Sequence, residues 1–234
     1  MKPSIKTNWI RGIMFALLVT LIGAKSCMVN AQSTHSYTYY GYGLSMGVPQ
    51  YELNSNIPQL NGLKVNLLGF NLGGMIANKY GKLKANAGSF YSGSSMPYEI
   101  DMMQVSVSGN IYLLRLNEVK VHLFEPYATL EISQQVSKFY GDYLSKDPSS
   151  SSSSTSQPLL GKVNSARLNV GGGVELQLEN DNQKFIHLFA EVVYGTPISS
   201  SASNNAFSQT KAMNSVTFNF GVNFGLVKIG RYKR

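Results

Sequence analysis

The stretch from Val216 to Leu226 alternates strictly between apolar residues and polar or glycine residues. Side chains on a β-strand point to opposite faces with a period of two, so this stretch predicts a strand with one strongly apolar face. Its length matches the ~9–11 residues with which a tilted strand crosses a bilayer. A soluble sandwich would turn this face inward, whereas a membrane barrel would turn it toward lipid. The apolar face carries Val216, Phe218, Phe220, Val222, Phe224 and Leu226.

The first 31 residues predict a cleavable export signal. Basic residues open the chain, and the apolar run from Ile13 to Ala24 is shorter than the roughly 20 residues of a spanning helix. Small residues then precede a predicted cleavage between Ala31 and Gln32. The alternative for this segment is a retained N-terminal anchor.

The single cysteine, Cys27, lies between the apolar run and the predicted cleavage site. Cleavage before Cys27, with lipid attached to it, is an alternative. The preceding Ala24-Lys25-Ser26 fits it poorly, because a lysine beside the cut is unusual in lipoprotein signals. If the cut falls after Ala31, the mature chain has no cysteine for a disulfide, a thiol nucleophile or a metal.

The remaining chain has single-domain length and contains no apolar run long enough for a spanning helix. Of 20 basic residues four lie in the signal, against none of the 12 acidic residues, so the net charge falls from +8 to +4. No basic stripe interleaved with aromatic residues occurs, and we expect no nucleic-acid partner. The predicted organisation is a signal peptide (1–31), a barrel (32–226) and a basic periplasmic tail (227–234).

Alternating segments continue along the whole mature chain, without helical periodicity of useful length. They are predicted at about 37–48, 64–77, 83–91, 100–115, 119–138, 165–178, 185–194 and 216–226.

The connections between these segments alternate in length. Outer-membrane barrels join an even number of antiparallel strands by short periplasmic turns and long outer loops. The chain therefore predicts an all-β, eight-stranded antiparallel up-and-down transmembrane β-barrel with both ends in the periplasm. The longer connections are 49–62, 92–99, 141–162 and 195–213, and the short ones are 78–82, 116–118 and 179–184.

Several short stretches strengthen this interpretation. Glu125-Pro126-Tyr127-Ala128 opens a predicted strand, Asn169 to Glu175 (NVGGGVE) lies within another, and Phe189-Ala190-Glu191 lies in the penultimate one. With the aromatic last strand, they resemble the small outer-membrane β-barrel family of Gram-negative bacteria, the OmpA/OmpX-like and "porin family" domains. The resemblance covers nearly the whole mature chain and implies the architecture, while the family's roles span structural, adhesive, channel and secretion-accessory functions.

The resemblance also implies a role for the last strand. Its lipid-facing residues Phe218, Phe220, Val222 and Phe224 would serve as the recognition signal for the barrel-assembly machinery. Related barrels usually end on an aromatic residue, whereas residues 225–234 follow Phe224 here. We expect an internal assembly signal, and the alternative is a strand that runs on to Tyr232 with the same parity. The internal signal is favoured because the longer strand would place Lys228 and Gly230 on the lipid face.

Charged residues recur on the polar faces of the predicted strands. The lumen of an eight-stranded barrel is only wide enough to be filled by side chains, and buried charges must be paired or hydrogen-bonded. These residues therefore predict an interior polar network, and the alternative is a gated pore whose ion pairs rearrange. A tight turn at Asn180–Asn182 would set Glu175 nearly opposite His187. The predicted network consists of Lys84, Glu125, Glu131, Arg167, Glu175, His187 and Glu191.

Support for catalysis is thin. Of the three histidines, His35 lies near the mature N-terminus, His122 is predicted on the lipid-facing side near a turn, and His187 has no serine fixed beside it by a motif. Since a nucleophile, base and orienting group must be mutually placed, we expect no catalytic residues and no enzyme.

Cofactor and metal sites are not expected either. Three scattered histidines without a mature cysteine do not give metal-ligand spacing. The run Gly171-Gly172-Gly173 is not followed by the Gly-Lys-Ser/Thr of a phosphate-binding loop. A bend or a close approach within a barrel strand is the favoured explanation for these glycines.

These observations predict a small outer-membrane protein with a structural or surface-interaction role. Its expected partners are outer-membrane lipid, the barrel-assembly machinery and an extracellular partner on the loops, especially Gly141 to Lys162. The alternatives are a narrow passive, porin-like channel and a soluble periplasmic ligand-binding barrel, whose apolar faces would point inward.

Overall fold

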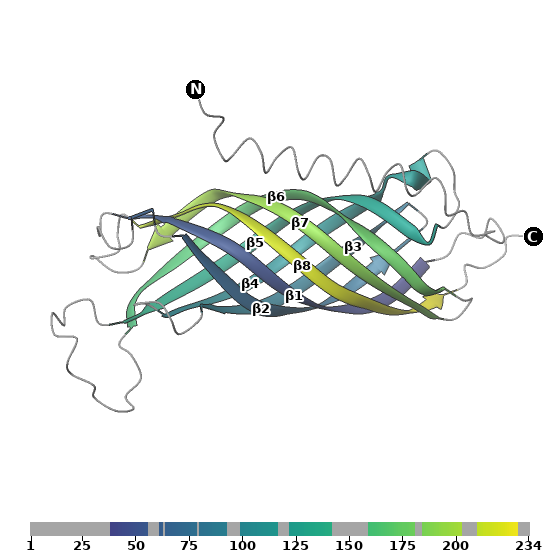
Figure 1. Cartoon of the computed structure of the whole chain (residues 1–234), viewed down its shortest axis with the longest axis horizontal. Helices are drawn as coiled ribbons and strands as arrows, with labels where there is room; N and C mark the ends of the chain where they lie inside the picture. Colours follow the sequence, from purple (N-terminus) through teal and green to yellow (C-terminus); the bar gives the residue numbers. More distant parts are fainter. Residues whose placement is uncertain are drawn as a thin grey trace, which may run out of the picture.

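The chain folds into a closed barrel of eight strands (Figure 1). The computed structural model describes residues 38–55, 61–62, 64–78, 80, 81–92, 99–116, 122–141, 159–180, 184–202 and 210–228. The signal, its cleavage site at Ala31 and Gln32, Cys27, His35 and residues 229–234 of the tail lie outside them. The strands are β1 (Thr38–Asn54), β2 (Lys64–Ala77), β3 (Gly81–Ser92), β4 (Glu99–Tyr112), β5 (Phe124–Tyr140), β6 (Leu159–Asn180), β7 (Lys184–Ala202) and β8 (Lys211–Lys228).

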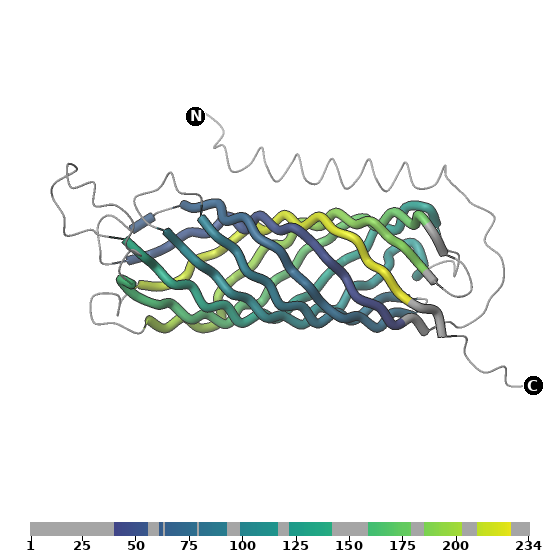
Figure 2. Tube along the Cα trace, turned by 90° about the horizontal axis from the view of Figure 1, so that it is seen from below, coloured from purple at the N-terminus to yellow at the C-terminus, as the bar shows by residue number. Residues whose placement is uncertain are grey.

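Every strand pairs antiparallel with its sequence neighbours, and β1 closes the barrel against β8. This confirms the predicted eight-stranded antiparallel architecture. Figure 2 shows β1 and β8 side by side along the wall. The one helix of the described residues is the short 3-10 turn η1 (Leu114–Leu116), and none there is long and apolar enough to cross a membrane.

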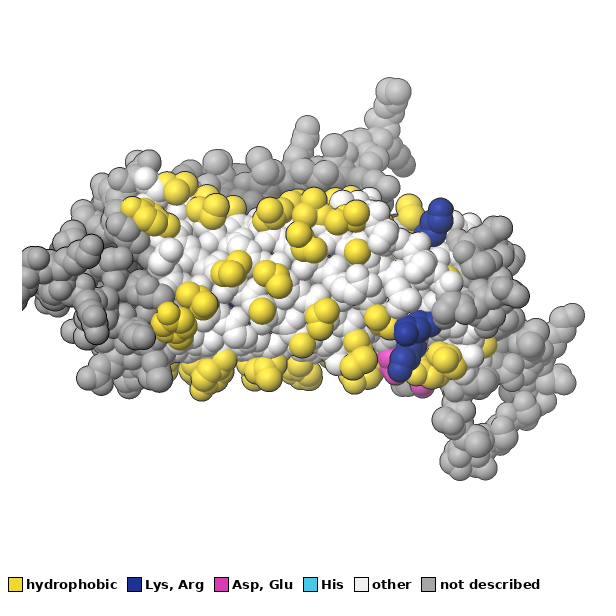
Figure 3. All heavy atoms as spheres, turned by 180° about the vertical axis from the view of Figure 1, so that it is seen from behind, with side chains coloured by type: hydrophobic (Ala, Val, Ile, Leu, Met, Phe, Trp, Pro, Cys, Tyr) yellow, Lys and Arg dark blue, Asp and Glu magenta, His cyan; other side chains and the backbone are white. Residues whose placement is uncertain are grey.

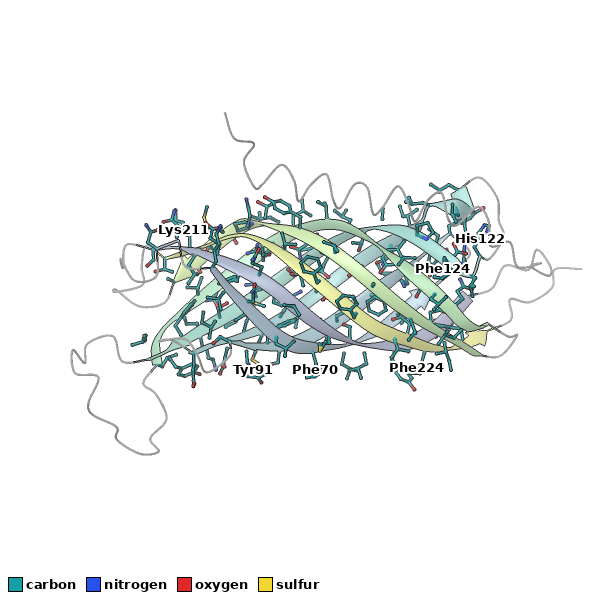
Figure 4. All side chains as sticks on the ribbon, viewed as in Figure 1. Phe70, Tyr91, His122, Phe124, Lys211 and Phe224 are labelled. Atoms are coloured by element: carbon teal, nitrogen blue, oxygen red, sulfur yellow. The ribbon has the colours of Figure 1, made fainter. Side chains whose placement is uncertain are left out.

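Strict alternation gives the wall an apolar outer face, while the inner face carries mostly buried polar and charged side chains along the middle of the barrel. Phe220 on β8 is 52% exposed, whereas the nearby Asn223 is buried. Phe70, Tyr91 and Phe224 lie on the outside of the barrel in Figure 4, and Figure 3 shows apolar side chains over much of the wall. The aromatic face of the last strand therefore points outward.

Four strands extend further than the alternation predicts, all toward the end with the long connections: β1 to Asn54, β6 from Leu159, β7 to Ala202 and β8 from Lys211. At that end the interior positions become apolar while outward positions such as Glu52 and Lys162 are polar, so the alternation is reversed and does not continue the pattern of the membrane-facing part. The apolar interior residues form a packed cluster inside the barrel mouth, which we call the apolar plug: Tyr51, Leu53, Val65, Leu67, Phe90, Ile100, Met102, Phe139, Val163 and Ala212.

The connection between β4 and β5 also differs from the prediction. It runs over residues 113–123 and contains η1, whereas the sequence predicted strands up to Arg115 and again from Val119. Leu113 and Leu123 continue the alternation of the strands on either side, which is why the sequence predicts strand there; residues 117–121 lie outside the described residues. At the other end of the last strand, β8 continues to Lys228, beyond the predicted barrel end at Leu226.

The barrel interior as the candidate functional site

An ion pair joins opposite walls of the barrel near its short-turn end. Lys82 on β3 and Glu175 on β6 come within 2.7 Å, Nζ to Oε1, and both side chains are 1% exposed. These strands are not neighbours, so the pair bridges the lumen rather than two adjacent strands. A charge-assisted bond inside a low-dielectric interior ties the two walls together.

Glu175 is the centre of a wider group. Its Oε2 accepts a hydrogen bond of 2.7 Å from the Tyr112 hydroxyl, and its Oε1 accepts one of 2.8 Å from the Asn223 amide. His187 Nδ1 lies 3.4 Å from the same Oε1. Side chains from β4, β7 and β8 thus converge on one carboxylate of β6, as a fully buried charge requires.

Aromatic rings surround the ammonium group of Lys82. Its Nζ lies 5.0 Å from the ring centre of Tyr127 and 5.7 Å from that of Phe189. Both distances are within the range of cation–π attraction. Aromatic faces and one carboxylate together replace the water that this cation loses on burial.

A second ion pair closes the short-turn end. Arg115, carried by η1, donates from Nε to Glu125 Oε1 at 2.9 Å, and the backbone N–H of His122 donates to the same oxygen at 2.7 Å. The Arg115 guanidinium also lies 4.2 Å from the ring centre of Tyr112. The prediction that His122 faces lipid is wrong: His122 is buried, and its backbone N–H binds the buried Glu125 carboxylate.

The middle of the lumen holds a small polar cavity of about 40 Å³, lined among others by Lys84, Glu131 and Glu191. Lys84 Nζ lies 3.8 Å from Glu191 Oε2, and Glu131 accepts a hydrogen bond of 2.6 Å from the Asn169 amide. A water molecule needs roughly 10–15 Å³ of such space, so the cavity has room for a few waters.

Arg167 lies between this cavity and the apolar plug. It is fully buried, and its Nη2 donates to the carbonyl oxygens of Gly195 and Met213 and to the Ser215 hydroxyl. Within the described residues no carboxylate comes within ion-pair distance of its guanidinium. Carbonyl dipoles of β7 and β8 take the place of a counter-ion.

All seven residues of the predicted polar network lie on the inner side of the wall, and six are buried, with Glu131 half-buried. Lys84 and Glu191 pair with each other, and Glu125 and Glu175 pair with cations outside the predicted set. His187 contacts Glu175, while Glu131 and Arg167 bind neutral groups. Glu175 and His187 are diagonal neighbours, since His187 pairs in register with Gln177.

Sequence reasoning missed Lys82, Tyr112, Arg115 and Asn223, which complete the two clusters around Glu175 and Glu125. Lys82 shares its parity with Lys84, and Tyr112 shares its parity with Asn110, so strand alternation could have placed both inside. Alternation alone could not have shown which partner each would reach.

The glycine run on β6 makes room for interior side chains. A Cβ on Gly173 would lie 2.6 Å from the hydroxyl oxygen of Tyr127, and one on Gly171 would collide with the carbonyl oxygen of Val192. A close approach within the strand, one of the two predicted explanations, therefore applies to both glycines.

No group of three or more histidine, cysteine or acidic residues suited to a metal ion occurs in the described part of the chain. His187 contacts Glu175 through Nδ1, and its Nε2 has no hydrogen-bond partner among the described side chains.

No protein-family model and no curated protein matches the sequence. Among solved structures, the chain is similar to Neisserial surface protein A (NspA), with a TM-score of 0.52 and 10% identity over 78% of this chain and 95% of that one. Ail of Yersinia pestis, in complex with the heparin analogue sucrose octasulfate, gives 0.41 and 12% over 83% and 100%. OprG of Pseudomonas aeruginosa gives 0.40 and 10% over 86% and 100%. The likeness to NspA shows that the chain has the fold of small eight-stranded outer-membrane barrels.

Proposed function

We propose that this chain is an exported protein of the Gram-negative outer membrane. The barrel is its anchor, and the long connections are its contact surface for an extracellular partner. One observation carries the proposal: the wall is apolar on the outside, while the inside is filled by an apolar plug and paired charges. Such a molecule fits a structural or surface-interaction role without catalysis.

Outward apolar side chains support insertion in a bilayer. On β4 they run from Met103 to Ile111, which matches the ~9–11 residues that a tilted strand needs to cross the hydrocarbon. Exposed apolar surface on this scale is costly in water and favourable in lipid. The long connections lie at one end of the barrel and the short turns at the other. Since outer-membrane barrels have short periplasmic turns, the short-turn end faces the periplasm.

The filled interior argues against the alternative of a narrow passive channel. The apolar plug blocks one end and the Arg115–Glu125 and Lys82–Glu175 pairs block the other. Opening a path would require breaking buried ion pairs, which is costly. A constitutive porin-like function therefore has no support in this arrangement.

The alternative of a soluble ligand-binding barrel requires apolar faces that point inward. Phe70 and Phe220 point outward instead, and the cavity in the middle of the lumen is polar and holds only a few waters. A lipid or drug-sized ligand needs a cavity of roughly 300–1,000 Å³.

Fractionation tests the location. The protein is expected in the outer membrane, with faster gel migration before boiling than after it, as a folded barrel shows. Recovery in the soluble periplasmic fraction would overturn the proposal. The mature N-terminus is expected at Gln32, whereas a lipid on Cys27 would support the lipoprotein alternative.

Planar-bilayer recording of the purified protein separates the two membrane roles. We expect no unitary conductance from the native chain, because its lumen is plugged. Steady single-channel currents would favour the channel instead.

A further inference from the structure

The charges around the cavity in the middle of the lumen do not balance. Its lining contains one cation, Lys84, and two carboxylates, Glu131 and Glu191, which gives a formal charge of −1. Lys84 Nζ lies 3.8 Å from Glu191 Oε2, whereas no described cation comes within ion-pair distance of Glu131. Arg167 does not line the cavity, and its Nη2 is directed to backbone carbonyl oxygens of β7 and β8. A buried charge of this kind is costly unless another charge compensates it.

A chain of side-chain amides leads from Glu131 to an acceptor without a donor. Because an ionised carboxylate only accepts hydrogen bonds, Gln104 turns its Nε2 toward Glu131 Oε1, at 3.4 Å. Gln104 Oε1 then accepts a hydrogen bond of 2.9 Å from Gln135 Nε2. This leaves Gln135 Oε1 without a hydrogen-bond partner, although Gln135 is only 5% exposed and lines the cavity.

Asn219 on β8 repeats this arrangement at the other carboxylate. Its Nδ2 donates to Glu191 Oε1 at 3.3 Å, and its Oδ1 has no hydrogen-bond partner. Asn219 lines the same cavity. Two carboxylates and two amide oxygens from β5, β7 and β8 thus border one small space, with more acceptors than the described donors satisfy. Buried polar atoms without a partner are uncommon in folded proteins, and each one calls for an explanation.

A hard cation would meet both needs, the missing charge and the missing partners. Carboxylate, amide and water oxygens are the ligands that such ions prefer. Water alone would donate to the amide oxygens but would leave the charge of −1 in place. A monovalent ion brings the charge of the cavity to zero, whereas a divalent ion would leave +1 beside Lys84. The volume of about 40 Å³ has room for one ion and one or two waters, since a water needs roughly 10–15 Å³.

We propose that the middle of the lumen binds one monovalent hard cation, of which sodium is the probe, between Glu131 and Glu191. Gln135 Oε1 and Asn219 Oδ1 supply neutral oxygen ligands, and the charge of Lys84 disfavours divalent ions. The site differs from a transition-metal centre, for which the described residues hold no group of three histidine, cysteine or acidic ligands. The ion ties β5, β7 and β8 together from inside the barrel.

Ion-dependent unfolding tests the proposal on the mature chain folded in an uncharged detergent at neutral pH. Urea titrations at constant ionic strength replace choline chloride stepwise by sodium chloride. An ion that binds only the folded state stabilises it by mass action, so the unfolding constant should fall about tenfold for each tenfold rise in sodium above its dissociation constant. Choline is too large for the cavity and should have no such effect.

Variants connect this effect to the cavity. Glu131→Gln removes the uncompensated charge and should abolish the dependence on sodium, whatever its stability in choline. Gln135→Leu removes one oxygen ligand and should weaken sodium binding on the order of tenfold. Glu52→Gln is the matched control: it neutralises a carboxylate whose side chain is 43% exposed, and it should keep the native dependence.

Identical urea midpoints in sodium and in choline would overturn the inference, as would an equal sodium dependence in the native chain and the Glu131→Gln variant. A midpoint that responds to pH but not to sodium would also overturn it, because a proton would then balance the charge. Thallium(I), a heavy monovalent cation, locates the ion directly. Crystals grown with thallium(I) should show an anomalous peak between Glu131 and Glu191, and peaks confined to the exterior of the barrel would contradict the site.

Discussion

The Nζ of Lys82 on β3 and the Oε1 of Glu175 on β6 lie 2.7 Å apart across the lumen, although β3 and β6 are not neighbouring strands. Tyr112, Asn223 and His187 hold the carboxylate from other strands. The pair therefore acts as a cross-brace of the barrel at its short-turn end.

Removing one partner of this brace should be costly. Lys82→Met leaves the Glu175 carboxylate buried without its cation, and we expect a loss of about 3–5 kcal/mol in the free energy of unfolding. Urea titration of the protein in lipid vesicles measures it. Lys64→Met is the matched control, since Lys64 faces an exposed partner at 3.8 Å, and it should cost less than about 1 kcal/mol. Equal losses in the two variants would contradict the cross-brace.

The apolar plug should contribute more to stability than the apolar wall does at the same height. Met102 is fully buried in the plug, whereas its neighbour Met103 is 60% exposed on the outside. Met102→Ala should lower the free energy of unfolding by about 2–5 kcal/mol, because it leaves a cavity. Met103→Ala should cost clearly less under the same titration, since lipid or detergent refills the space. A larger loss for Met103 would mean that the plug is not a packed core.

Replacing Gly173 by a residue with a side chain should destabilise the barrel. A methyl group there meets the Tyr127 hydroxyl and the backbone of Ala190, so Gly173→Ala is expected to cost about 1–3 kcal/mol by overpacking. A Cβ on Gly109 would meet nothing within 4 Å, and Gly109→Ala should be close to neutral. The urea midpoint compares the two, and near-ultraviolet circular dichroism should report a displaced tyrosine in the first variant only.

A charged residue on the outer wall should destabilise the barrel more the nearer it lies to the middle of the bilayer. Phe220 lies midway along β8, and Phe220→Arg is expected to destabilise the inserted barrel by about 2–4 kcal/mol, as for arginine at a bilayer midplane. Met213→Arg, near the long-connection end of the same strand, should cost about 0–1 kcal/mol. Refolding yield in vesicles and urea titration measure both. Similar costs at the two positions would contradict a bilayer centred on the barrel.

Alternation predicted the barrel because it persists in strands that have one apolar and one polar face. β2 has its predicted bounds, 64–77, and the inner position of Glu131 and Glu191 follows from parity alone. The pattern becomes ambiguous where it reverses, with apolar residues inside and polar residues such as Glu52 outside. Tyr51 and Leu53 continue β1 into the plug, yet the surrounding proline and asparagine made this part resemble a loop.

The partners within the network could not be predicted in the same way. Parity places Glu175 inside, but whether Lys82 on β3 can reach it on β6 depends on the barrel radius and the strand tilt. Arg115 illustrates this point: its apolar neighbours extended a predicted strand, while in the structure η1 carries it under the barrel to Glu125.

Because β1 pairs with β8, the closed barrel has no first or last strand in space, although the chain has one in sequence. Thr38 and Lys228 are register partners, so the first and last described residues lie side by side at the short-turn end. A short linker between them, with new ends opened at another turn, would give a circular permutant that keeps every strand pairing. The same barrel wall is therefore expected to form whichever hairpin the chain starts from.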